Sequence, residues 1–189
     1  DSLYHLARGR LVSDRWNYRN VDINNYVLAA EELAERGYYV IRMGSLVKSP
    51  INSSNPKVID YALNGMRSDF MDIYLGAKCL FCVTCGTGYD AIPVIFRKPI
   101  AFVNHAPIGY IYTYLKDAVG ISKRYWLVTE NRWLTLREIF LSDIGYCLSS
   151  SCFQKRSIEV VENTPREILS VVIEMLERVK DIWIPMKDD

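Results

Sequence analysis

The stretch Cys79-Leu-Phe-Cys-Val-Thr-Cys-Gly-Thr-Gly-Tyr-Asp90 is the strongest indication of how this chain folds. An apolar run from Cys79 to Val83 ends abruptly in hydroxyl-bearing residues and glycines. This pattern is typical of a buried strand that leads into a tight turn. In open α/β sheets, ligands bind beyond the carboxyl ends of the strands, and glycines there let backbone N–H groups approach a phosphate. The stretch therefore predicts an anion- or nucleotide-binding turn.

The glycine turn matches neither of the two common phosphate-binding motifs. It lacks the Gly-Lys-Ser/Thr of a Walker loop, and Gly86-x-Gly88 lacks the third glycine of the dinucleotide fingerprint. A plain structural turn between strand and helix is the alternative. Because two threonines and two glycines leave the backbone accessible, we expect the turn to contact phosphate or ribose through Thr84, Gly86, Thr87 and Gly88.

Segments typical of strands and of helices alternate along the rest of the chain. This alternation predicts an α/β fold, a Rossmann-like parallel sheet with helices on both faces, in a single domain spanning residues 1–189. Residues 106–133 are aromatic and irregular and are expected to form loops or a short helix. The expected strands are 38–43, 58–61, 79–85, 99–103 and 158–161, and the expected helices are 22–36, 68–78, 91–96 and those beginning at Thr135 and Thr164.

Composition narrows the class of protein. The chain has 189 residues, half of them apolar, which is enough for one globular domain with a sizeable core. Its 23 basic and 22 acidic residues give a net charge of +1, so there is no basic excess to predict a nucleic-acid partner. The Lys123-Arg124 pair is predicted to lie on a solvated face. No run reaches the ~18 apolar residues that span a bilayer.

The cysteines could suggest a metal site, but their spacing argues against one. Cys79, Cys82 and Cys85 recur every third residue, which in a strand places them on opposite faces. No second cysteine pair or nearby histidine completes a ligand set. We therefore predict small buried side chains and no metal. The odd total of five, with Cys147 and Cys152, favours a reducing compartment over a disulfide framework.

Polar residues at other strand ends are further candidates for the site. Arg42 precedes Gly44 at a predicted strand end, where it can bind a phosphate bidentately; a structural ion pair is the alternative. Asn104 and His105 follow another strand. His105 could bind a phosphate or act as acid or base, and a histidine satisfied by a backbone carbonyl is equally compatible with the sequence.

Two more residues have a structural interpretation first. Ser68-Asp69 is predicted to cap a helix and, second, to contact ribose or base. The sequence contains no Ser-His-Asp order, no His-Glu-x-x-His motif and no Asp-x-Asp pair, so it offers no support for hydrolase or metal-nucleotide chemistry.

Several motifs together resemble one protein family. They recur in this order: Tyr38-Tyr-Val-Ile-Arg-Met-Gly44, Ser68-Asp-Phe-Met-Asp-Ile-Tyr-Leu75, Gly86-Thr-Gly88, Arg97-Lys-Pro99-Ile with Val103-Asn104, Leu134-Thr135 to Glu138-Ile-Phe140, and Glu162-Asn-Thr-Pro165. The combination covers nearly the whole chain and is similar to a family of bacterial glycosyltransferases encoded among surface-polysaccharide genes. The resemblance implies the carboxyl-terminal, donor-binding half of a GT-B enzyme, which has two Rossmann domains.

The resemblance also implies that part of the enzyme lies upstream. In the family, an Arg on a first strand precedes an Asp-Ser like Asp1-Ser2, and this sequence lacks that strand and that Arg. The expectation is that the chain lacks its first strand and an acceptor domain, which would leave it inactive in isolation. The base that deprotonates the acceptor is expected in that missing half. Within this chain, His105 and Asp1 are the catalytic candidates.

The activity implied is transfer of a sugar from a nucleotide-sugar donor to a surface-polysaccharide, glycan or lipid-linked acceptor, without metal or other cofactor. Arg42 and the glycine turn would hold the diphosphate. The implied location is the cytoplasm or the inner face of the membrane, with any peripheral membrane contact made through the missing regions.

Two other functions stay open on the sequence. One is a non-catalytic nucleotide- or sugar-binding module that partners a catalytic chain. The other is a sugar-nucleotide epimerase of related fold, which would need acid–base groups in its cleft. The available groups of that kind are chiefly His105, Asp90 and Asp69.

Overall fold

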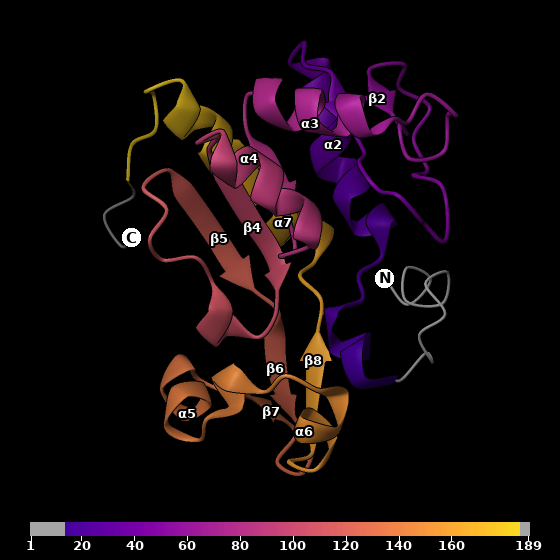
Figure 1. Cartoon of the computed structure of the whole chain (residues 1–189). Helices are drawn as coiled ribbons and strands as arrows, with labels where there is room; N and C mark the ends of the chain where they lie inside the picture. Colours follow the sequence, from indigo (N-terminus) through magenta and orange to yellow (C-terminus); the bar gives the residue numbers. More distant parts are fainter. Residues whose placement is uncertain (1–13, 186–189) are drawn as a thin grey trace.

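Parallel strands and helices alternate along most of the chain in the computed structural model, which describes residues 14–185 (Figure 1). The predicted α/β class is confirmed, and the parallel strands with their helices are compatible with a Rossmann-like fold. The parallel strands form two groups. β1 (Val40–Ile41) pairs with β2 (Val58–Ile59), and β4 (Ile100–His105) lies between β3 (Cys82–Thr84) and β5 (Ala118–Ser122).

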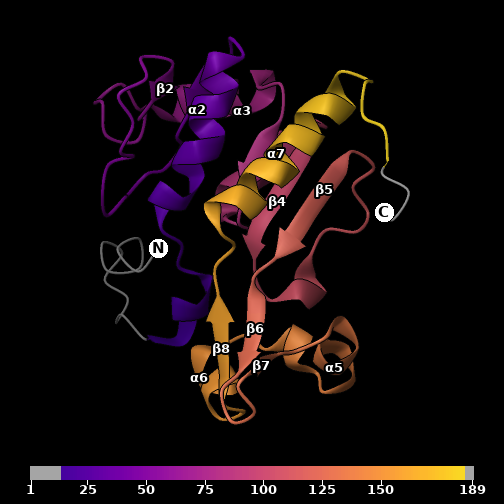
Figure 2. The same cartoon turned by 180° about the vertical axis from the view of Figure 1, so that it is seen from behind.

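Helices cover both faces of these strands. α2 (Val27–Glu35) packs against α7 (Pro165–Val179) on one face, as seen from behind in Figure 2. α3 (Asp69–Lys78) packs against α4 (Ala91–Ile95) on the other face (Figure 1). The main core lies on the α2–α7 side, where buried residues of both helices meet Ala101 and Val103 of β4.

A second, smaller sheet lies below the carboxyl ends of β4 and β5 (Figure 1). β6 (Arg124–Leu127) pairs antiparallel with β7 (Arg132–Trp133) and with β8 (Ile158–Val161). Together with α5 (Leu136–Leu141) and α6 (Ser150–Gln154), this sheet encloses its own core around Tyr125 and Phe153. The prediction that residues 158–161 join the parallel sheet is therefore wrong, because they pair with β6 instead.

The prediction of loops or a short helix for residues 106–133 is partly wrong, since a short 3₁₀ helix at Ile108–Tyr110 is followed by β5, β6 and β7. β5 contains Gly120, a residue with low β propensity. A Cβ added there would lie 2.6 Å from Phe102, so the glycine allows β5 to pack closely against β4. In β6, Tyr125 is the one fully buried residue. Strands this short do not show an alternating pattern in the sequence.

Helix starts follow the sequence closely. Ser68 caps α3, and Thr135 and Thr164 form capping boxes with Glu138 and Glu167. The starts of the strands agree less well with the sequence prediction, because β3 begins at Cys82 rather than Cys79. α3 continues to Lys78 and Cys79 is its C-cap, so three residues that look like strand do not pair.

The cysteine prediction is partly wrong. Cys147 and Cys152 form a disulfide that closes a short loop at the start of α6, whereas the sequence argument expects no disulfide. An odd number of cysteines does not exclude a local disulfide between two of them, and here the paired cysteines are five residues apart. Cys79, Cys82 and Cys85 are free and half-buried, and burial raises the pKa of the Cys82 thiol to about 12. That thiol is therefore protonated at neutral pH.

Candidate functional site

Buried polar side chains gather where β3, β4 and β5 end, above the second sheet. Thr84 ends β3, His105 ends β4, and Lys123 follows β5; each is at most 7% exposed. Asp90 follows the glycine turn and is 2% exposed. We call the group Arg19, Thr84, Gly86, Asp90, His105 and Lys123 the carboxyl-edge cluster. Burying so many polar groups is costly unless they are paired or meet a ligand.

The glycine turn is organised around the hydroxyl of Thr84. Its Oγ1 accepts hydrogen bonds from the backbone N–H of Gly86 at 3.1 Å and of Thr87 at 3.5 Å. Gly86 has a φ of +83°, a backbone conformation that residues with a side chain adopt only under strain. Arg19 donates from Nη2 to the Gly86 carbonyl. The turn is thus held in shape from both sides, while Thr87 and Gly88 stay exposed.

His105 lies directly against this turn. A Cβ added to Gly86 would lie 2.7 Å from the His105 ring. The ring makes an edge contact with Phe102 at 5.4 Å between centroids. Both ring nitrogens are buried and neither makes a hydrogen bond of normal geometry within residues 14–185, but the backbone of Tyr110 interacts with the ring and opposes the lowering of its pKa by burial. Burial lowers the pKa of the imidazole, so the ring is neutral at pH 7. A neutral ring keeps one donor and one acceptor for a ligand.

Asp90 is the acidic member of the cluster. Burial raises the pKa of its carboxyl to about 6, against the opposing influence of the Arg19 charge and a hydrogen bond with Thr84. Its Oδ2 has no hydrogen-bond partner in the described part of the chain. An acid that titrates near neutrality is suited to proton transfer or to accepting a bond from a sugar hydroxyl.

Lys123 brings a buried positive charge to the edge. It is 3% exposed, and its Nζ donates to the Asn20 carbonyl. Burial lowers its pKa, and the carboxylate of Glu162 opposes that shift. Glu162 in turn accepts hydrogen bonds from the Asp22 N–H and the Asn25 side chain, so the loop before α2 is tied to the end of β8.

Asn104 anchors the edge from beneath. Its φ of +56° coincides with a break in the register of β4 against β5 between Phe102 and His105. Asn104 and Asn163 each accept the other's backbone N–H at 2.6 Å, and the Asn104 amide also donates to Tyr26. Both polar atoms of the Asn104 side chain are therefore engaged within the protein.

The structure leaves the other predicted ligand groups apart from the cluster. Arg42 donates from Nη1 to Asp60 at 3.0 Å and to the Ser49 carbonyl, which agrees with the alternative of a structural ion pair. Gly44 lies beside it and packs on Val47. Within residues 14–185, no hydrogen bond joins this end of β1 to the glycine turn.

Ser68 and Asp69 lie at the start of α3. Ser68 accepts the N–H of Met71 as a helix cap, which confirms its structural interpretation. The Asp69 side chain is fully exposed and lies 3.8 Å from Arg67. Asp1 lies outside the described residues. The glycine turn and His105 are thus the predicted site residues that the fold brings into contact.

Sequence reasoning missed the two cations of the cluster. Arg19 comes from a polar, aromatic stretch with no recognisable motif, and it reaches the turn only through the path of the loop before α2. Lys123 was expected on a solvated face and is buried instead, because it lies at the junction of β5 and β6. Arg124 is exposed as expected, over the ring of Trp133.

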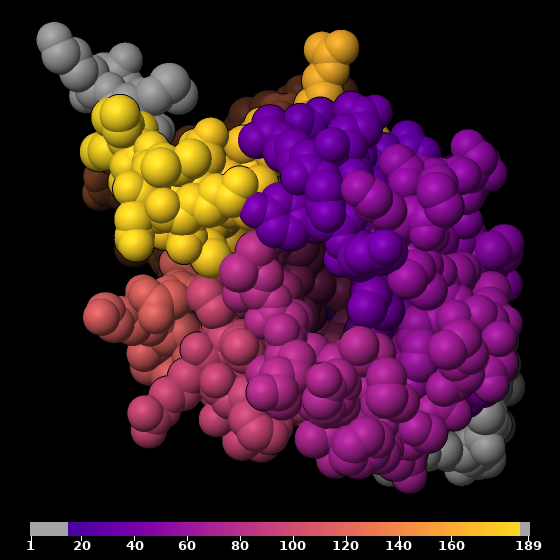
Figure 3. Space-filling model, turned by 90° about the horizontal axis from the view of Figure 1, so that it is seen from above, coloured from indigo at the N-terminus to yellow at the C-terminus, as the bar shows by residue number. Residues whose placement is uncertain are grey.

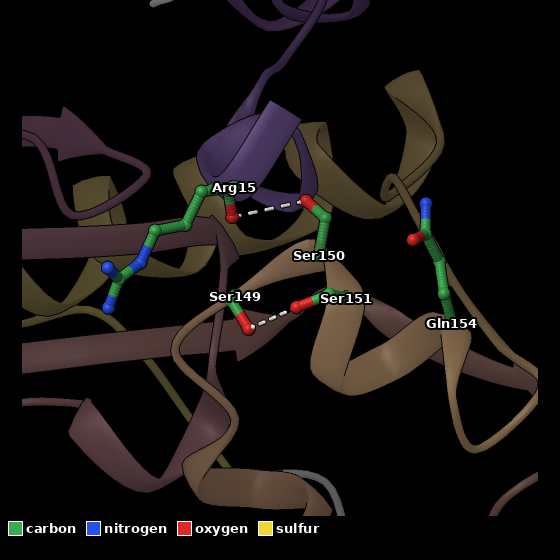
Figure 4. A pocket seen from close by; sticks show the side chains of 5 residues that line it. All are labelled: Arg15, Ser149, Ser150, Ser151 and Gln154. Carbon is green, nitrogen blue, oxygen red and sulfur yellow. Dashed lines mark hydrogen bonds between the residues drawn. The ribbon is translucent and has the colours of Figure 1, made fainter. Parts of the chain in front are cut away.

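A separate pocket of about 320 Å³ lies between the 3₁₀ helix Asp14–Arg19 and α6 (Figure 4). Three of the five residues that line it are serines. The Ser150 hydroxyl donates to the Arg15 carbonyl, and the hydroxyls of Ser149 and Ser151 are 3.0 Å apart. None of the predicted ligand residues lines it. It is an open recess at a junction of two short helices.

The chain was compared with known proteins. No protein-family model, no curated protein and no solved structure matches it. Within residues 14–185, no helix combines the length and apolar character needed to cross a bilayer. In the same range, no three His, Cys, Asp or Glu side chains are grouped as a metal site would need.

Proposed function

We propose that the chain is the donor-binding part of a nucleotide-sugar glycosyltransferase, related in fold to one half of a GT-B enzyme. The observation that carries the proposal is His105. The residue is 5% exposed, neither ring nitrogen makes a hydrogen bond of normal geometry among the described residues, and the ring lies against a glycine turn at the carboxyl edge of a parallel sheet. A ligand with oxygen atoms at this edge would satisfy that ring.

The chemistry of the cluster suits a leaving diphosphate. In glycosyl transfer, the bond from the sugar to the diphosphate breaks while the diphosphate gains negative charge. Fixed N–H groups and cations aimed at that charge lower the barrier. Arg19 and Lys123 supply positive charge next to the turn, and Thr87 and Gly88 supply exposed backbone.

His105 and Asp90 are assigned to the sugar end of the donor. A neutral imidazole can donate to a phosphate oxygen or accept from a sugar hydroxyl, and the Asp90 carboxyl can accept from another hydroxyl. Arg42 remains a proposed diphosphate ligand from the end of β1. To bind the diphosphate, the Arg42 guanidinium would have to donate to it while also donating to Asp60 and to the Ser49 carbonyl.

A nucleotide panel tests the proposal. GDP, UDP, CMP and dTDP are added separately to the chain, and the melting temperature is followed. A ligand at 100 times its Kd stabilises the folded state by about 2.7 kcal/mol, so one nucleoside phosphate should raise the melting temperature clearly. Absence of any shift with all four at millimolar concentration would contradict donor binding.

A pair of arginine variants locates the site. Arg19→Ala removes a cation next to the glycine turn from an exposed position and should abolish the shift. Arg36→Ala, which removes an equal charge from a distant α2 ion pair with Glu32, should keep it. Equal shifts in both variants would move the site away from the turn. Arg42→Ala is a less clean test, because it also releases Ser49 and Asp60.

Turnover separates this proposal from its alternatives. A donor-binding domain should bind a nucleotide-sugar and transfer its sugar only when the acceptor half is present. A binding module would never transfer, even with that half supplied. An epimerase would convert one nucleotide-sugar into another with no acceptor, which chromatography of the nucleotide pool detects.

A further inference from the structure

The connection between β4 and β5 differs from the crossover that precedes it. α4 connects β3 to β4, as a helix usually does between parallel strands. Residues 106–117 connect β4 to β5, and within them the 3₁₀ helix Ile108–Tyr110 is the only helix. Figure 3 shows the end of this connection, in salmon, at the surface between α7 in yellow and the pink segment that leads to β4. A loop thus takes the place of a crossover helix, and it begins directly after His105.

Part of this loop lies on the α3–α4 side of the sheet. Ala101 and Val103 of β4 belong to the core on the α2–α7 side, so Phe102 between them points to the opposite face. The ring of Tyr112 meets Phe102 edge-on, at 5.5 Å between centroids. Gly120 of β5, which pairs with Phe102, is exposed and brings no side chain to this face. Tyr112 therefore covers a part of the sheet that a crossover helix would otherwise cover.

Tyr112 and Tyr114 form a stacked pair. Their centroids are 5.6 Å apart with 27° between the ring planes, so one face of the Tyr114 ring is occupied by Tyr112. The Tyr114 side of the pair is open, because this residue is 73% exposed. Tyr110, from the same loop, turns elsewhere, and its ring meets Tyr146 edge-on at 6.1 Å. The pair is thus an aromatic surface fixed to Phe102 at one end and open to solvent at the other.

A single exposed tyrosine is common on protein surfaces, so the neighbours of the pair decide whether it is a site. Phe102, which contacts Tyr112, also meets the His105 ring edge-on at 5.4 Å. Burial raises the pKa of the Tyr112 hydroxyl and the charge of Asp90 raises it further, so Asp90 is close enough to act on this tyrosine. The pair therefore adjoins the carboxyl-edge cluster.

The members of the cluster nearest to the pair are the ones with unused polar atoms. Within residues 14–185, Asp90 Oδ2 and both ring nitrogens of His105 are buried and make no hydrogen bond of normal geometry. Burying such groups is costly unless a ligand meets them. An aromatic surface beside them fits a ligand that has a planar ring as well as polar groups.

A nucleoside diphosphate has both parts. Its diphosphate suits the glycine turn with Arg19 and Lys123, and its base is a planar ring that stacks on aromatic side chains. Resting on the proposed function, we propose that the Tyr112–Tyr114 pair is the subsite for the nucleobase of the donor, with the base stacked on the open face of Tyr114. The base would then lie at the β4–β5 connection and not at Ser68, whose hydroxyl caps α3.

Stacking of this kind favours nucleotides over bare diphosphates without choosing strongly among bases, because every base has a π face. The subsite therefore contributes affinity for any nucleoside diphosphate that the turn accepts. Contacts to the edge of the base, from other residues, would decide which nucleotide binds best.

Variants of Tyr114 test the subsite, because an exposed ring can be removed without opening the core. Tyr114→Ala removes the ring, and Tyr114→Phe keeps the ring without its hydroxyl. Tyr39→Ala is the matched control, since Tyr39 is 69% exposed and precedes β1. Isothermal titration calorimetry gives the Kd of GDP, UDP, dTDP and inorganic pyrophosphate for the parent and each variant. Pyrophosphate carries the charges without a base.

Tyr114→Ala should raise the Kd of each nucleoside diphosphate that the parent binds by about fivefold or more and change that of pyrophosphate by less than about twofold. Tyr114→Phe and Tyr39→Ala should match the parent. An unchanged nucleotide Kd in Tyr114→Ala would overturn the base subsite while leaving diphosphate binding at the turn intact. Equal weakening of nucleotide and pyrophosphate would overturn it too, since the ring would then act on the diphosphate or on the fold.

The parent chain separates this proposal from the one on which it rests. A parent that binds pyrophosphate but none of the three nucleotides has an anion site without a base subsite, which overturns the role of the tyrosine pair alone. A parent that binds neither pyrophosphate nor any nucleotide contradicts donor binding itself, and the subsite with it.

Discussion

At the scale of single residues, Gly86 and Gly88 make different demands although they share one turn. Gly86 has a φ of +83° and touches the His105 ring, whereas a Cβ at Gly88 would meet nothing within 4 Å. Gly86→Ala should therefore lower the free energy of unfolding by roughly 1–3 kcal/mol, the usual cost of a side chain in the left-handed region. Urea unfolding measures it.

Gly88→Ala is the matched control and should change that free energy by about 0.5 kcal/mol or less. Equal losses in both variants would mean that the turn tolerates no side chain for reasons other than the backbone conformation of Gly86 and its contact with His105. A neutral Gly86→Ala would contradict the close contact with the ring.

Asp90 provides a second prediction at this scale, through pH. Burial raises the pKa of its carboxyl to about 6, while an unfolded aspartate titrates near 3.9. The folded state thus holds the proton more tightly between pH ~4 and ~6, so this group lowers stability as the pH rises through that window. Asp90→Asn removes the effect. The variant should be about 3 kcal/mol more stable than the parent at pH 8 and nearly equal at pH 4.

The lowered pKa of His105 acts in the opposite direction, because its unfolded form binds a proton first and stability falls as the pH drops below about 6.5. Parent and variant share that contribution, so it cancels in their difference. Denaturant titrations at several pH values give the difference directly. A destabilised Asp90→Asn at pH 8 would contradict an unfavourable buried carboxylate.

At the scale of elements, the start of α7 is fixed by its cap. Thr164 Oγ1 accepts the Glu167 N–H at 3.3 Å, and Glu167 accepts the Thr164 N–H at 2.7 Å. Thr164→Ala should lower the free energy of unfolding by about 1 kcal/mol, because the N–H of Glu167 loses its partner at the start of the helix that fills the main core. Circular dichroism during thermal unfolding provides the measurement.

Thr164→Ser keeps the hydroxyl and loses only a methyl group, so it should retain most of that stability. If the serine variant loses as much as the alanine variant, the methyl group rather than the capping hydrogen bond stabilises the helix start.

Helix ends of this kind could be predicted because their signals are local. Thr164, Pro165 and Glu167 stand next to one another in the sequence, and the apolar face of α7 follows at helical spacing. Strand partners are not local. Residues 158–161 look like any buried strand, and only contact with β6 decides that they pair antiparallel outside the main sheet.

The site divides in the same way. The glycine turn and His105 each follow a strand, so the shared edge of a parallel sheet predicts that they meet. Arg19 reaches that edge along a loop whose path depends on Glu162 and Asn20, and no local pattern encodes it. The number of cysteines does not predict the Cys147–Cys152 disulfide either, because the two residues meet where the chain turns into α6.

At the scale of the whole molecule, the two helical faces differ in packing. The α2–α7 face contains a continuous buried cluster that includes Met175, which is 1% exposed. The α3 face leaves large apolar side chains in solvent, with Phe70 71% exposed and its ring stacked on Tyr74.

This asymmetry predicts very different costs for two truncations of large apolar side chains. Met175→Ala should lower the free energy of unfolding by about 2–5 kcal/mol, since it leaves a cavity between α7 and the sheet. Phe70→Ala should change it by about 0.5 kcal/mol or less, because the ring is already hydrated. Urea unfolding of both variants gives the comparison. A large loss at Phe70 would show that α3 contributes to the core, and the two faces would then be energetically alike despite their difference in burial.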